Sequence, residues 1–265
     1  MPIPLPPLAA ALYLLATASL YYLLRRPHQA GSITLALGAC ALTAHAVLLY
    51  ANLWGQQVLN VRLADAGSMV SWVAALVVVA NSVTRPMLSL GLIILPLAAI
   101  TVFVSWVWPG RDYVVATSSN IQTAHSLIAI LAFGCLGLAV AQALLLAFQE
   151  RRLRRQPPVA STLLPSIETM ERLLFQLVLL GFLLLTITLI SGTVFSQEVW
   201  DKPFHLNHHT ILSLGAWISF GLLLVGRRVF GWRGRNAVRW TLVSFGILFL
   251  GYFGTRFIIE VILNR

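Results

Sequence analysis

The chain has 265 residues, of which 58% are hydrophobic and only 10% are charged, and its net charge is +10. A soluble domain carries about a quarter charged residues, and a water-soluble fold of this length could not bury so much apolar surface. The positive charges lie in short clusters between long apolar runs, which argues against a nucleic-acid partner and predicts a polytopic protein surrounded by membrane lipid.

Eight segments are long and apolar enough to cross roughly 30 Å of hydrocarbon as helices. Because backbone polar groups in lipid must be satisfied within each segment, the predicted fold class is an all-α bundle of about eight transmembrane helices. No repeat or soluble domain is visible, so we expect one transmembrane domain over residues 1–265. In chain order the predicted spans are 5–24, 31–53, 66–84, 87–108, 122–148, 171–195, 207–226 and 237–262.

The first span could be mistaken for a cleaved signal peptide. It has no basic residues before its apolar run, whereas Arg25 and Arg26 follow that run. This order predicts a retained helix whose N-terminus lies outside.

The basic residues also predict the orientation of the other spans. Thirteen of the 18 Lys and Arg residues fall in one set of loops, and the assignment alternates through all eight spans. By the positive-inside rule both termini lie outside, in the periplasm if the source is Gram-negative, and the location is the bacterial inner membrane. The basic run 151–155 is interpreted as a topology determinant that meets anionic lipid.

Histidines are the candidate functional residues. His28 falls in a cytoplasmic loop, whereas His45 lies about 14 residues, or roughly 21 Å, into the second span. The remaining four stand at outer helix entrances: His125, His205, His208 and His209. Any one of them could simply hydrogen-bond a neighbouring helix or sit at the interface. Together they suggest a site, because ionisable groups at membrane depth are costly and imidazole is a common ligand of metals and of haem iron.

Zinc and haem are the competing ligands. Zinc needs a compact tetrahedral set, but there is no H-E-x-x-H and no cysteine near the outer histidines. Haem needs one or two axial histidines, an apolar slot and cations for its propionates. Arg256, one to two turns inside the last span, is the cation of most interest, although it could also snorkel or pair with Glu260. Trp200 could wall a porphyrin or belong to an aromatic belt.

Three stretches resemble the cytochrome c assembly family of CcsA, CcmC and HemX-like proteins, and in particular its YpjD-like inner-membrane branch. The first is Ser119–His125. The second runs from Ser191-Gly192-Thr193-Val194-Phe195 through Trp200-Asp201 to Trp217. The third joins Gly231-Trp232-Arg233-Gly234-Arg235 to Tyr252–Phe257. The resemblance is strongest over 120–260 and looser over the first four helices.

The resemblance implies that haem is held at the outer leaflet by paired histidines over a tryptophan-rich segment. His125 matches the first outer histidine, and Trp200 with Asp201 matches the end of that segment. The full Trp-x-Trp-Asp-Pro-Lys-Glu run is absent, as is the second outer histidine expected after the last helix. These departures argue against synthase activity more than against haem binding.

The leading hypothesis is therefore an inner-membrane protein that holds or transfers non-covalent, b-type haem and assists cytochrome c maturation or a related membrane process. We expect His125 and His208 as axial ligands, with His209 and His45 in reserve, while Trp200 walls the site and Arg256 meets a propionate. The expected partners are lipid, haem and another inner-membrane protein or an apocytochrome. A small-solute or metal-ion transporter and a non-catalytic membrane scaffold are the alternatives.

Overall fold

The computed structural model describes residues 4–25, 32–54, 59–60, 63–81, 85–108, 114–115, 120–155, 164–200 and 208–254. Eight helices in these ranges are long and apolar enough to cross a membrane, which confirms the predicted all-α class and the number of spans. The helices group into two compact units, one of residues 1–116 with 158–166 and one of residues 117–157 with 167–265. The single transmembrane domain and the outward orientation of the termini stay predictions.

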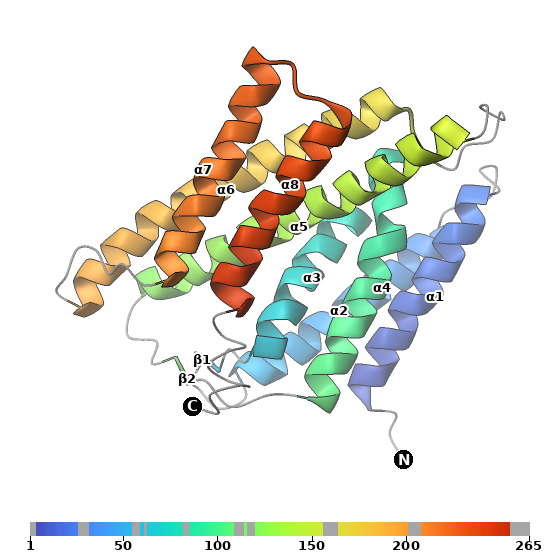
Figure 1. Ribbon diagram of the computed structural model, residues 1–265. Helices are drawn as coiled ribbons and strands as arrows, with labels where there is room; N and C mark the ends of the chain where they lie inside the picture. The colour runs from blue at the N-terminus through green and yellow to red at the C-terminus, as the bar shows by residue number, and fades with distance from the viewer. Residues whose placement is uncertain are drawn as a thin grey trace. The chain divides into compact units, whose positions relative to one another are not determined.

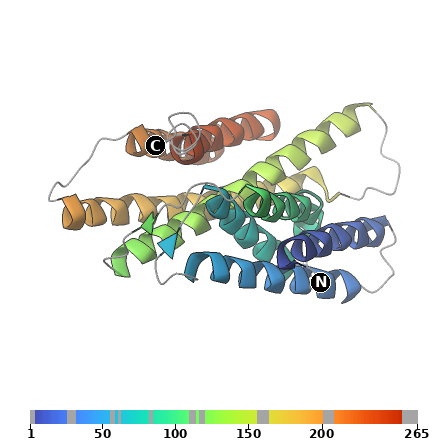
Figure 2. The same cartoon turned by 90° about the horizontal axis from the view of Figure 1, so that it is seen from below.

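The first unit contains four helices and a short strand pair: α1 (Leu5–Arg25), α2 (Ser32–Trp54), β1 (Leu59–Asn60), α3 (Leu63–Ala80), α4 (Arg85–Val107) and β2 (Val114–Val115). Helix α1 packs against α2 and α4, and α3 packs against α4; Figure 2 shows α1 and α2 side by side. The sequence did not suggest the antiparallel pair, in which Leu59 lies opposite Val115. Two-residue strands are too short to carry an alternating pattern.

The second unit contains the other four helices: α5 (Asn120–Arg155), α6 (Ile167–Trp200), α7 (His208–Val229) and α8 (Gly234–Phe249), which continues as the π-helix η1 (Leu250–Gly254). These helices run alternately up and down (Figure 1). Helix α5 packs against α6 and α8, and α7 packs against α6, α8 and η1. At 36 residues α5 is about 54 Å long, so it extends beyond the hydrocarbon, as its basic last turns predict.

Glycines allow close helix contacts inside each unit. A Cβ atom at Gly91 of α4 would lie 2.5 Å from Leu20 Cδ2 of α1. In the second unit, a Cβ atom at Gly181 of α6 would lie 2.5 Å from Leu136 Cδ2 of α5. Helix association in lipid relies on packing rather than on the hydrophobic effect, so small residues at the crossings let the backbones approach.

Candidate functional site

The second unit brings two of the predicted histidine positions to one end. Helices α5 and α7 begin at this end, and α6 and α8 finish there (Figure 1). We call it the histidine end and define it by His125 of α5, Ser191 and Gly192 of α6, His209 of α7 and Tyr252 of η1. His45 belongs to the first unit.

His125 is held against the last turns of α6 by its ring. Its Nδ1 atom lies 2.9 Å from the hydroxyl oxygen of Ser191, and that hydroxyl donates to the backbone carbonyl of Thr188 at 3.1 Å. The Thr188 backbone carbonyl also accepts a hydrogen bond from His125, so the three groups form one hydrogen-bonded set. When the Ser191 proton is on the Thr188 carbonyl, the Ser191 oxygen accepts from His125 Nδ1–H, and in that tautomer the imidazole lone pair is on Nε2.

Gly192 leaves room for the same ring. A Cβ atom at this position would lie 3.2 Å from His125 Cε1, a contact tighter than ordinary packing. The ring can come this close to α6 because glycine has no side chain there. The hydrogen bond and the glycine together hold the ring in place, which is what the outer contacts of a metal-ligating histidine provide.

His209 lies against the π-helix η1. Its ring centroid is 6.0 Å from that of Tyr252, at 68° between planes. The close approach depends on Gly251, where a Cβ atom would lie 3.0 Å from Leu212 Cβ. π-helical turns are frequent at functional sites because they redirect side chains from the regular helical register.

Next to this contact, aromatic rings form a continuous cluster between α5 and the end of α8. The ring centroid of Phe133 of α5 lies 5.8 Å from the centroids of both Tyr252 and Phe253. The Phe253 ring stacks on that of Phe249, with 4.9 Å between centroids. We call these four residues with Phe245 the aromatic cluster. It provides a rigid apolar wall beside His209.

His45 is a buried bridge between three helices of the first unit. Its side chain is 1% exposed, with Nδ1 at 3.1 Å from the Tyr13 hydroxyl of α1 and Nε2 at 2.7 Å from the Ser68 hydroxyl of α3. Both ring nitrogens are therefore occupied. To bind iron, His45 would have to give up one of these hydrogen bonds inside the bundle.

Several predicted site residues lie outside what the structure describes. His208 opens α7 and Trp200 ends α6, but their side chains are not among the described ones, and Arg256 lies beyond the described residues. Within the described ranges, no group of three or more His, Cys, Asp or Glu side chains could hold a metal ion.

The sequence reasoning did not assign a role to Ser191, Gly192, Tyr13 or Ser68. The first two lie within a stretch that carries the family resemblance, so they could have been suspected as neighbours of His125. Tyr13 and Ser68 have no sequence signal, because single hydroxyl residues in apolar helices more often bond their own backbone.

Comparisons with known proteins agree with the resemblance. Residues 33–263 match the model of the family described as "Cytochrome C assembly protein". The "Inner membrane protein YpjD" of Escherichia coli strain K12 is 29% identical over 230 residues, which cover 84% of each chain. The "Cytochrome c biogenesis protein CcsA" of Thermosynechococcus vestitus is 33% identical over 89 residues, which cover 34% of this chain and 28% of the relative. No solved structure matches.

Proposed function

Because this chain belongs to the cytochrome c assembly protein family, we propose that it is a haem-binding protein of the bacterial inner membrane that assists cytochrome c maturation. The inner-membrane location is supported by the eight apolar helices and by the name of the Escherichia coli relative, an inner membrane protein. The observation that carries the haem assignment is the hydrogen bond between His125 Nδ1 and the Ser191 hydroxyl at 2.9 Å, which orients the imidazole at the histidine end.

His125 serves as one axial ligand in this proposal. Neutral imidazole with its other N–H held by a hydrogen-bond acceptor is the usual form of a histidine bound to iron. The second ligand is His208 or His209, because both open α7 at the histidine end. Bound haem would supply an iron centre that accepts two axial nitrogens and a flat apolar ring carrying two carboxylates.

The surroundings of the histidine end fit such a group. Haem needs a rigid apolar wall. The aromatic cluster would provide one next to His209, which contacts the cluster through Tyr252. Trp200, at the end of α6, is the second aromatic residue that we assign to the site, and Arg256 is the cation that we assign to a propionate. The binding is non-covalent and b-type, since the sequence has no C-x-x-C-H.

His45 is a reserve ligand only. Its two hydrogen bonds join α1, α2 and α3, so a role in holding the first unit together explains its burial without haem. The protein holds haem or passes it to an apocytochrome or another inner-membrane protein, without acting as the synthase.

An optical spectrum tests the proposal. We expect the purified protein in detergent, supplemented with haem, to show a Soret band and sharpened bands after reduction with dithionite. Acid-acetone extraction should remove all of the pigment, because no thioether bond holds it. A featureless spectrum after haem supplementation would refute haem binding and favour the transporter or the scaffold, which transport assays in proteoliposomes and co-purified partners would separate.

A further inference from the structure

The turn between α7 and α8 is a second built surface, at the opposite end of the second unit from the histidine end. It includes the run Gly231-Trp232-Arg233-Gly234-Arg235, to which the proposed function assigns no role. Because it joins the spans His209–Val229 and Gly234–Gly254, it lies at the membrane surface. We call Arg228, Phe230, Trp232, Arg233 and Arg235 the basic turn.

The backbone of the basic turn is fixed by internal hydrogen bonds. The N–H groups of Phe230 and Trp232 both donate to the carbonyl oxygen of Gly226, at 3.0 and 3.1 Å. Gly231 and Gly234 have φ angles of +63° and +51°, which side chains other than glycine rarely adopt. The turn therefore presents its side chains from one defined conformation.

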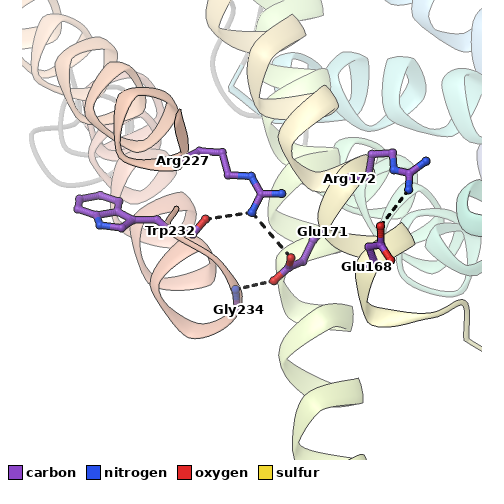
Figure 3. Close-up of polar contacts among 6 residues, drawn as sticks. All are labelled: Glu168, Glu171, Arg172, Arg227, Trp232 and Gly234. Carbon is purple, nitrogen blue, oxygen red and sulfur yellow. Dashed lines mark hydrogen bonds and ion pairs between the residues drawn. The ribbon is translucent and has the colours of Figure 1, made fainter. Parts of the chain in front are cut away.

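Glu171 of α6 closes the inner side of the turn (Figure 3). One carboxylate oxygen accepts from the backbone N–H of Gly234 at 2.7 Å, and the other lies 3.9 Å from Arg227 Nη1. The same Arg227 nitrogen donates to the carbonyl of Trp232 at 3.3 Å. Arg227 and Glu171 therefore satisfy each other and the turn, so that neither charge is left for a ligand.

An aromatic stack packs against the basic turn. The Trp232 ring lies against Gly226, where a Cβ atom would come within 2.4 Å of the ring, and it stacks on Trp240 at 5.3 Å. Phe230 stacks on Trp232 at 6.2 Å, yet it is 71% exposed. Tryptophan and exposed phenylalanine together are typical of the boundary between headgroups and acyl chains.

Four exposed arginines lie in or next to this turn in the sequence. Arg228, Arg233, Arg235 and Arg239 make no ion pair or hydrogen bond within the described part of the chain. Among the nearby acidic residues, Glu168 is paired with Arg172 at 3.3 Å, Glu171 accepts from the Gly234 N–H, and Glu150 of α5 has a carboxylate oxygen 2.7 Å from where a Cβ atom of Gly234 would lie. Four unpaired arginines against the one carboxylate of Glu150 leave a net positive charge at a rigid turn with an exposed aromatic side chain.

From this arrangement we propose that the basic turn is a binding site for the phosphate headgroup of an anionic phospholipid. Guanidinium groups bind phosphate oxygens through paired N–H donors, and the exposed Phe230 matches the acyl boundary next to them. A preformed turn loses little freedom on binding. A soluble anion would use the arginines but not the exposed aromatic side chain, so the lipid explains both features.

Thermal unfolding with added lipid tests this proposal. The whole protein in a zwitterionic detergent should be stabilised by phosphatidylglycerol but not by phosphatidylcholine. Each arginine near an anionic surface is worth about fivefold in affinity, so the double variant R233Q/R235Q should need roughly 25-fold more phosphatidylglycerol for the same stabilisation. Its unfolding temperature without lipid should equal that of the wild type, because both side chains are exposed.

The control is R25Q, which removes one positive charge from the exposed end of α1 in the first unit, compared with the single variant R235Q in the basic turn. We expect R25Q to keep most of the lipid stabilisation. An equal loss in R25Q and R235Q would refute a local site in favour of general surface charge. Equal stabilisation by phosphatidylcholine, or by inorganic phosphate alone, would refute an anionic-lipid site.

Discussion

Replacing Ser191 with alanine removes the hydroxyl that hydrogen-bonds His125 Nδ1 at 2.9 Å. The helix itself should tolerate the change, because the lost hydroxyl otherwise bonds only the Thr188 carbonyl of its own helix. Side-chain hydrogen bonds between membrane helices contribute about 0.6 kcal/mol on average, so we expect a stability loss of about 0.5–1 kcal/mol. The larger effect falls on the imidazole of His125, which loses a contact that orients it.

Removing the hydrogen-bond partner of a metal-ligating histidine commonly weakens metal binding 10- to 100-fold. The S191A variant should therefore bind haem at least about tenfold more weakly than the wild type, and S191T, which keeps a hydroxyl, should bind more tightly than S191A. The assay is titration of the detergent-solubilised protein with haem, followed at the Soret band.

Ser219 provides the matched control for this experiment. Its hydroxyl lies 2.6 Å from that of Ser244, buried between α7 and α8 in the same unit, away from His125. The S219A variant should lose a similar amount of stability but no haem affinity. Unchanged affinity in S191A, or an equal loss in S219A, would refute the role given to the hydrogen bond; failure of the wild type to bind haem would instead refute the proposed function.

Other variants test the packing and polar contacts. E171A should lower the stability of the detergent-solubilised protein by about 1–3 kcal/mol, because it removes the acceptor of the Gly234 N–H and leaves Arg227 with only the Trp232 carbonyl. Replacing the exposed Glu168 by alanine should change the stability by less than about 0.5 kcal/mol, and similar losses in the two variants would contradict this role of Glu171. G181A should destabilise the protein by about 1–3 kcal/mol, because its added Cβ would clash with Leu136 of α5. G246A should not destabilise it, because a Cβ atom there would meet nothing within 4 Å. Thermal unfolding of the two variants tests this difference. Y13F should lower the stability by about 1 kcal/mol, because it removes the hydrogen bond to the buried imidazole of His45. It should leave the haem spectrum unchanged. An altered spectrum would assign His45 to the haem site.

The sequence was a good guide to the helices because long apolar runs and clustered charges are strong signals in a membrane protein. The largest differences are at helix ends: α6 extends to 167–200 against a predicted 171–195, and α5 continues to Arg155. Hydropathy predicts which part of a helix lies in the hydrocarbon. The helix itself can continue beyond the hydrocarbon, so hydropathy does not predict its ends. The π-helical end of α8 was not predictable, since its register depends on the packing of Gly251 against α7.

For the candidate site, the sequence indicated which residues to examine but not their contacts. Trp217, which ends one of the stretches that resemble the family, donates through its indole N–H to Thr186 and stacks on Phe182, so it is a packing residue. Glu171 of α6 accepts from the first N–H of α8, a contact that no signal in the sequence indicated. Such partners lie tens of residues apart in the chain, and spacing patterns within one helix do not predict them.

The haem content of wild type and H125A, purified in parallel after haem supplementation, tests the central claim most directly. His28, which falls in a predicted cytoplasmic loop, provides the control variant H28A. The account predicts pyridine haemochrome bands close to stoichiometric in wild type and H28A, and loss of most of the haem in H125A. Equal haem in all three proteins, with identical reduced spectra, would contradict the claim that His125 holds the iron.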